Sequence, residues 1–163
     1  MEETMNFNQE IQNAQVDFQG TESPYFLLGL LSEFNNRYQA TADTFFEEIS
    51  WKQFFAIICI GLYKEAPTLK ELSELMGSSH QNVKQILLKL ESKGFVEMLP
   101  DEKDKRKQRI FWTEKTRVFC KEHDEESTVI VGKIFEGIDP KNIEITIKTI
   151  LQMDENLKGV KIK

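Results

Sequence analysis

Residues 68–113 constrain the fold of this chain more than any other stretch. Their first half carries two apolar stripes at three- and four-residue spacing, one on each side of Gly77. The stripes consist of Leu69, Leu72, Leu75 and Met76, and of Val83, Ile86, Leu87 and Leu90. This spacing predicts two amphipathic helices, and Ser79 and Gly94 are placed to cap and to end the second one. Two short helices joined by a tight glycine turn form a helix-turn-helix.

A charged segment between two apolar runs follows the second helix. The runs are Phe95, Val96, Met98 and Leu99, and then Arg109, Ile110, Phe111 and Trp112. Residues 101–108 between them are strongly polar, so we expect a β-hairpin whose loop projects into solvent and is not buried. Thr68 is expected in a short strand that completes the sheet. The predicted fold class is mainly α with a small β-hairpin wing, a winged helix-turn-helix.

Both ends of the chain carry apolar helical patterns. The pairs Ser23-Pro24 and Asp139-Pro140 each predict a helix start, with an N-cap followed by proline. The apolar positions are Leu27, Leu31, Phe34 and Tyr38 in the first helix, and Ile143, Ile147, Ile150, Leu151, Met153 and Leu157 in the last. Residues 1–22 form either one amphipathic helix or a partly ordered arm, with a frayed leader as the alternative. Helices this apolar need burial against other surfaces.

Two further helices are expected between these ends. Residues 50–53 read as a capping box in front of the apolar stretch 54–62, which we expect at the centre of the fold. Thr113 is expected to cap a long helix that follows the wing and ends at Gly137.

Five short segments of the chain resemble the MarR family of bacterial transcription regulators. They are residues 69–77, Asn82-Val83-Lys84-Gln85, residues 90–96, Asp104-Lys105-Arg106 and Thr113-Glu114-Lys115. In this order and at these spacings the resemblance covers residues 24–157. The chain departs from the family pattern at Ser78, a usually apolar position, at Trp112, where Leu is usual, and at Thr116, where Gly is usual. None of these departures removes a DNA-contacting position.

The resemblance implies a dimer whose terminal helices intertwine around a two-fold axis. We therefore expect four segments: an N-terminal arm or short helix in residues 1–22, an N-terminal dimerisation helix in 23–48, a winged helix-turn-helix DNA-binding domain in 49–113, and C-terminal dimerisation helices in 114–163. Such a dimer would bind a pseudo-palindromic operator in double-stranded DNA.

The charge of the chain is unevenly distributed. The whole chain has 21 basic and 27 acidic residues, a net charge of −6, which at first argues against nucleic acid. Residues 77–109 contain eight Lys or Arg against five Asp or Glu, a local +3, which leaves 13 basic and 22 acidic residues elsewhere. Positive charge is therefore concentrated in the predicted helix-turn-helix and wing, residues 68–113, which we call the reading head. The acidic remainder of the chain is expected to limit non-specific binding to DNA.

The expected DNA-contacting residues lie on the second helix and in the hairpin loop. They are Ser79, His80, Gln81, Asn82, Lys84, Gln85 and Lys89 on the helix, and Lys103, Asp104, Lys105, Arg106 and Lys107 in the loop. Amide and basic side chains can pair with base edges and phosphates. In the resembled family the Asp of an Asp-x-Arg motif orients an Arg that enters the minor groove, and Asp104 and Arg106 match that motif.

Two function classes remain open from the sequence. The first is a dimeric, sequence-specific transcription regulator, a repressor. The second is a winged-helix interaction module that uses the same face to bind a protein and does not read DNA. A protein-binding face usually presents aromatic anchors, which the exposed positions of the second helix lack.

The resembled family often binds small aromatic or phenolic effectors between the dimer helices and the reading head. Here Phe34, Tyr38, Trp51, Phe55 and Trp112 are the candidate lining residues, with plain core packing as the alternative.

The sequence contains few residues or motifs typical of catalysis, metal binding or redox chemistry. Phosphate-loop and GxSxG motifs are absent, so we expect no enzyme activity and no cofactor. Cys120 and His123 have no second ligand pair, so we expect no metal site. Cys59 is expected to be buried and inert, with a thiol switch, known in some members of the family, as the alternative. The lack of long apolar runs and of paired cysteines predicts a cytoplasmic protein with no membrane contact.

Overall fold

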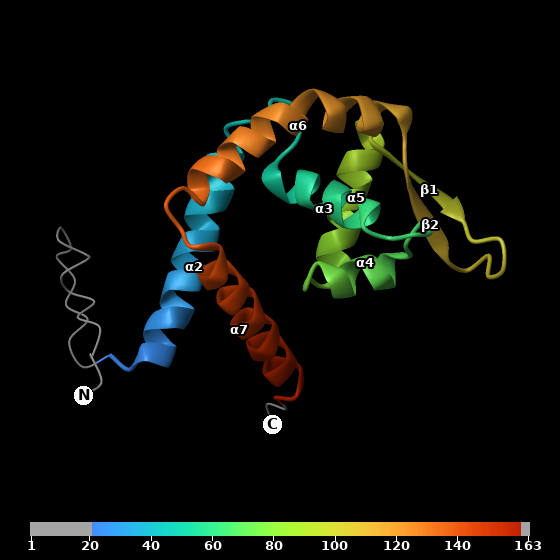
Figure 1. The fold of residues 1–163 in the computed structure, drawn as a ribbon. Coiled ribbons are helices and arrows are strands. Elements are labelled where there is room, and N and C mark those ends of the chain that lie inside the picture. The colour runs from blue at the N-terminus through green and yellow to red at the C-terminus, as the bar shows by residue number, and fades with distance from the viewer. Residues whose placement is uncertain (1–20, 161–163) are drawn as a thin grey trace. The chain divides into compact units, whose positions relative to one another are not determined.

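The computed structural model describes residues 21–160. Its helices and strands are α2 Ser23–Ala42, α3 Trp51–Gly61, α4 Leu69–Leu75, α5 His80–Ser92, β1 Val96–Pro100, β2 Gln108–Trp112, α6 Glu114–Ile134 and α7 Pro140–Lys158 (Figure 1). The predicted fold class, mainly α with a two-stranded wing, is confirmed. The helix or arm predicted in residues 1–22 falls almost wholly outside the described residues. The chain divides into two compact units, and the boundary between them in the sequence falls between Thr116 and Arg117.

The helix-turn-helix has the predicted turns at Gly77 and Gly94 and the predicted cap at Ser79, together with a cap of α4 that was not predicted. Thr68 and Glu71 form a reciprocal capping box at the start of α4. Gly77 has a φ of 58°, in the left-handed region that favours glycine, and it turns the chain toward α5. The Ser79 side chain accepts a hydrogen bond from the Asn82 backbone N–H, and Gly94 follows the last residues of α5 with a φ of 74°. Local signals therefore determine this motif.

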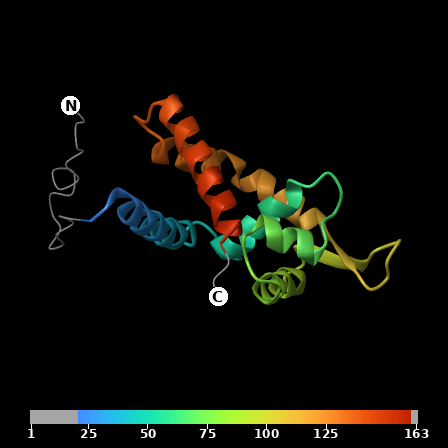
Figure 2. The same ribbon diagram turned by 90° about the horizontal axis from the view of Figure 1, so that it is seen from below.

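The wing is an antiparallel hairpin in which Val96 pairs with Trp112 and Pro100 with Gln108. It extends away from α3, α4 and α5 in both views (Figures 1 and 2). Thr68, predicted in a short strand, makes only an isolated bridge to Arg109. Its side chain caps α4 at the same time, so the backbone turns into a helix directly after this one strand-like contact.

The core of the first unit surrounds α3, as predicted. Side chains buried there come from α3, α4, α5, β1 and β2, together with Phe95 just before the wing. They are Ala56, Ile57, Cys59, Ile60, Leu72, Val83, Leu87, Leu90, Phe95, Val96 and Ile110. Ser50 and Gln53 form the predicted capping box at the start of α3. This core gives α5 and the wing a common support.

The predicted cap of α2 is wrong by one residue. Ser23 is already within the helix, Glu22 is the N-cap, and no side chain caps α2. Pro24 still lies in the first turn, because its fixed φ suits a helix start. The helix ends at Ala42 and leaves many apolar side chains exposed, among them Leu27, Leu28, Leu30 and Phe34.

The second unit contains most of α6 and all of α7. Asp139 caps α7 by accepting a hydrogen bond from the Lys141 backbone N–H, and proline occupies the first turn, as predicted. No residue of α7 is buried in the single chain. Exposed apolar side chains in this unit are Val118, Val129, Val131, Phe135, Ile138, Ile145, Ile147, Ile150, Leu151, Leu157 and Val160. These side chains lack cover within one copy of the chain.

Candidate nucleic-acid interface

One face of α5 is buried and the opposite face is exposed. Val83, Leu87 and Leu90 hold the helix on the core. All seven predicted contact residues of this region are exposed: Ser79, His80, Gln81, Asn82, Lys84, Gln85 and Lys89. The Asn82 side-chain amide donates to Ser78 Oγ over 2.8 Å, so the unusual serine of the turn orients one of these groups. The structure thus places the predicted set on one polar helix face.

The tip of the wing presents Arg106 to solvent, with 91 % of its side chain exposed. Asp104 Oδ1 accepts from Arg106 Nε over 3.1 Å and from the Arg106 backbone N–H over 3.2 Å. These hydrogen bonds hold the pKa of Asp104 below its usual range, with a smaller contribution from nearby Lys107. Asp104 therefore orients the arginine, the geometry expected of the Asp-x-Arg pair. Lys103, Lys105 and Lys107 are exposed around it.

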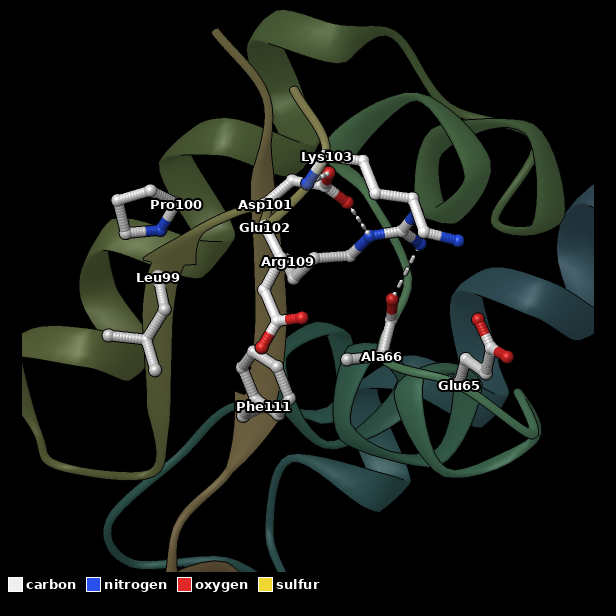
Figure 3. A pocket seen from close by; sticks show the side chains of 9 residues that line it. All are labelled: Glu65, Ala66, Leu99, Pro100, Asp101, Glu102, Lys103, Arg109 and Phe111. Carbon is white, nitrogen blue, oxygen red and sulfur yellow. Dashed lines mark hydrogen bonds and ion pairs between the residues drawn. The ribbon is translucent and has the colours of Figure 1, made fainter. Parts of the chain in front are cut away.

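Asp101 differs from the prediction for the wing loop. It was expected in solvent with residues 101–108, but it is buried, with 8 % exposure. Oδ1 accepts from the backbone N–H groups of Lys103 and Asp104, both over 2.8 Å, and Oδ2 accepts from Arg109 Nε over 2.6 Å (Figure 3). An Asp that bonds to amides two and three residues ahead is a common turn signal, so the sequence carried a hint of this role.

Because of these hydrogen bonds, we expect Asp101 to have a lower pKa than an ordinary aspartate. The bond from Arg109, and then the two amide bonds, lower the pKa of Asp101 from 3.8 to about 2. A lowered folded-state pKa means that the ionised carboxyl stabilises the fold at neutral pH, and that this stabilisation is lost as pH falls through about 2. We expect carbon-detected NMR titration to place the Asp101 midpoint near 2. A midpoint near 4 would show that the contact with Arg109 does not persist in solution.

A hollow of ≈ 420 Å³ lies among α2, α3, the α4–α5 turn and α5. Its lining includes three of the predicted effector residues, Tyr38, Trp51 and Phe55. Tyr38 meets Trp51 edge to face with ring centres 4.7 Å apart. The other lining residues are Asn35, Gln39, Lys52, Met76, Gly77, Ser78, Asn82 and Ile86. Ser78 and Asn82 reach the hollow from the turn before α5 and from α5, so the aromatic spacing behind the effector prediction did not point to them.

The other two predicted effector residues lie elsewhere. Phe34 stacks on Tyr38 at a centroid distance of 6.1 Å but does not line the hollow. Trp112 lies against α3, where its indole N–H donates to the Ile57 carbonyl over 3.0 Å. Trp112 thus joins the wing to α3.

The cysteines and histidines of the described segment show ordinary structural surroundings. Cys59 and Cys120 are both free, and burial raises the pKa of each thiol. The His123 ring stacks on Phe119, and its Nδ1 lies 2.9 Å from the Phe119 carbonyl oxygen. Within residues 21–160, no three His, Cys, Asp or Glu side chains gather as a metal site.

Within residues 21–160, no helix is both long enough and apolar enough to cross a bilayer.

Comparisons with known proteins agree with this geometry. The model of the MarR family matches residues 49–107, from the start of α3 through the wing loop. A MarR protein from Peptoclostridium difficile shares 18% identity and a TM-score of 0.76, covering 90% of this chain and 95% of that one. Streptococcus pneumoniae FabT, solved in complex with DNA, shares 23% identity and a TM-score of 0.64, with 85% and 99% covered.

A third solved structure has the same fold. A MarR/EmrR family regulator from Acinetobacter sp. ADP1 shares 13% identity and a TM-score of 0.76, covering 89% of this chain and 100% of that one. At such identities these likenesses establish the fold. Together with the family match, they confirm the predicted resemblance.

Proposed function

We propose, from the MarR-family winged helix at residues 49–107, that this chain is a dimeric, sequence-specific DNA-binding transcription regulator that acts as a repressor. The observation that carries the proposal is the arrangement of one reading head: a polar, exposed face on α5 and an oriented, exposed Arg106 at the tip of the adjoining wing. FabT, which has this fold, was solved bound to DNA. Operator binding in the chromosome would place the protein in the cytoplasm.

In this proposal α5 enters the major groove and reads base edges. Gln81, Asn82 and Gln85 can pair with adenine, while Ser79, His80, Lys84 and Lys89 contact base edges or phosphates. The wing residues Lys103, Lys105, Arg106 and Lys107 follow the neighbouring backbone and minor groove.

Gln81→Ala and Gln85→Ala test direct readout. Each bidentate amide–adenine pair contributes about 1–3 kcal/mol of discrimination, so each variant is expected to lose part of its preference for matched over mismatched operators. Fluorescence anisotropy titrations on both duplexes measure this preference. Unchanged discrimination in both variants would remove α5 as the reading element. If the parent itself binds no duplex selected from its own upstream DNA, the interaction-module alternative takes precedence.

The exposed apolar faces of α2, α6 and α7 support the dimer. One copy of the chain leaves Leu30, Phe34, Ile147 and Leu151 at least 41 % exposed, and a second copy would cover such surface. The proposed segments 23–48 and 114–163 supply these helices. Two α5 helices related by a two-fold axis would meet successive major grooves ~34 Å apart.

The dimer is tested by sedimentation together with footprinting. A dimer at micromolar concentration and a pseudo-palindromic footprint, with half-sites about one helical turn apart, are expected. A monomer that protects one half-site would contradict this assembly.

The hollow beside Trp51 is the proposed effector site. Stacked aromatic walls with a few amide groups suit a small aromatic or phenolic molecule. Because Ser78 and Asn82 line the hollow and also belong to the reading head, an occupant there would act on α5 directly. We expect a binding phenolic compound to quench Trp51 fluorescence and to weaken operator binding, with both effects lost in Tyr38→Ala. Quenching without any change in operator affinity would remove the regulatory role.

A further inference from the structure

We propose that Arg109 and Asp101 form a positioning bridge that fixes the wing against the helix-turn-helix, and that Arg109 acts on DNA only through Arg106. The inference rests on the proposed function and adds residues that neither the family motif nor the predicted contact set contains. Arg109 is one of the eight basic residues that give residues 77–109 their positive charge. Its position in the structure gives it a different role from the wing-tip cations.

The guanidinium group of Arg109 contacts Asp101, Ala66 and Glu71. Figure 3 shows the first two of these contacts. Arg109 Nε donates to Asp101 Oδ2 over 2.6 Å, at the start of the wing turn. Arg109 Nη1 donates to the Ala66 carbonyl over 2.9 Å and to Glu71 Oε2 over 3.4 Å. Ala66 precedes α4 and Glu71 lies in its first turn. The wing loop and the helix-turn-helix are therefore tied through one side chain.

The two acidic partners of Arg109, Asp101 and Glu71, each make further structural hydrogen bonds. Asp101 also accepts the backbone N–H groups of Lys103 and Asp104, which shape the wing turn. Glu71 accepts the backbone N–H of Thr68 over 2.7 Å and thereby caps α4. A movement of Arg109 would thus disturb the turn that presents Asp104 and the cap that starts α4 together.

The charge of Arg109 is compensated inside the protein. Its side chain is 30 % exposed and faces the carboxylates of Asp101 and Glu71, whereas the Arg106 side chain is 91 % exposed. A phosphate would have to compete with two carboxylates that already occupy the guanidinium. Lysine cannot replace Arg109 in this bridge, because its single ammonium group lacks the planar guanidinium that donates to several acceptors at once.

Arg109 lies beside a hollow between the start of α5 and the wing. A hollow of ≈ 490 Å³ is lined by Thr68 and Glu71, by His80 at the start of α5, and by Arg106 and Arg109 of the wing. Arg106 and His80 must reach neighbouring grooves of one duplex at the same time. By fixing the wing, the bridge sets the distance between Arg106 and His80 across this hollow.

A double-mutant cycle on operator binding separates positioning from direct contact. Arg109→Gln alone is expected to weaken binding about five- to tenfold. In the Arg106→Ala background, the same change is expected to weaken binding by less than about twofold, because the bridge acts through Arg106. Arg109→Lys is expected to behave like Arg109→Gln. Additive losses in the cycle, or recovery by lysine, would show that Arg109 contacts a phosphate and would overturn the inference.

Amide hydrogen exchange of the free protein tests, without DNA, whether the bridge holds the wing turn in place. Arg109→Gln and Asp101→Asn are each expected to speed exchange at the Lys103 and Asp104 amides about tenfold or more. Lys105→Gln, an exposed cation of the same loop, is the control and should leave these amides unchanged. Unchanged exchange in both bridge variants would overturn the inference. If the exchange result holds while the parent binds no operator, the proposed function fails and the bridge stands as a structural device.

Discussion

Gly61→Val is expected to lower the free energy of unfolding by about 1–3 kcal/mol, the range typical of an overpacked site. A Cβ atom at Gly61 would lie 2.4 Å from Cζ2 of Trp112 and 2.6 Å from Cη2, well inside contact distance. The indole cannot move freely, because its N–H donates to the Ile57 carbonyl over 3.0 Å. The added side chain must therefore break that hydrogen bond or push β2 away from α3.

Changing Trp112, the residue that a side chain at position 61 would meet, tests whether this contact causes the loss of stability. In a Trp112→Leu background the smaller side chain leaves room at position 61, so Gly61→Val is expected to cost much less there. Urea unfolding at one fixed protein concentration measures both backgrounds. Gly29→Val, in a helix where a Cβ meets nothing within 4 Å in one copy of the chain, is the matched control. Equal losses in the two backgrounds would show that Trp112 is not the obstacle.

This pair also explains a departure from the family pattern. Tryptophan at position 112, where the resembled family usually has leucine, is accommodated because α3 ends in a residue without a side chain. Thr116 replaces a usual glycine and is fully buried, but its hydroxyl donates to the Phe95 carbonyl. Both substitutions thereby acquire a hydrogen bond to the backbone.

The helix-turn-helix was predictable because its signals are local. A serine cap, glycines with positive φ and apolar stripes each act within a few residues, and the structure confirms them at Gly77, Ser79 and Gly94. The wing followed from the alternation of apolar and charged runs. The same local rules missed the start of α2: they place the N-cap at Ser23, but Glu22 is the N-cap and its side chain makes no capping hydrogen bond.

Features that depend on distant contacts were not predictable from patterns. Arg109 donates to Ala66 and Glu71, which lie 43 and 38 residues away, and the same guanidinium donates to the buried Asp101. The prediction that the whole wing loop is solvated followed from composition, and composition cannot reveal a paired, buried carboxylate. The hollow beside Trp51 was predicted only for its aromatic lining, because two of its polar residues, Ser78 and Asn82, reach it from the turn before α5 and from α5.

Arg106→Ala is expected to weaken operator binding by about 1–3 kcal/mol, or roughly five- to 150-fold. The narrow minor groove of A·T-rich DNA concentrates negative potential, and an arginine inserted there is strongly attracted. Asp104 already orients this side chain in the free protein, so less conformational entropy is lost on insertion. Because Arg106 is almost fully exposed, its removal should leave the thermal midpoint and the dimer unchanged.

The salt dependence of binding distinguishes this contact from a general charge effect. Arg106→Ala is expected to reduce the slope of log K against log salt by roughly one phosphate contact. Asp104→Ala should cause a smaller loss of affinity with the slope retained, since it frees the arginine without removing it. Arg37→Ala is the matched control, because Arg37 is an exposed arginine paired with Glu33 on α2, outside the reading head. If Arg106→Ala binds operator as Arg37→Ala does, the wing tip does not enter the groove, and α5 alone must account for recognition.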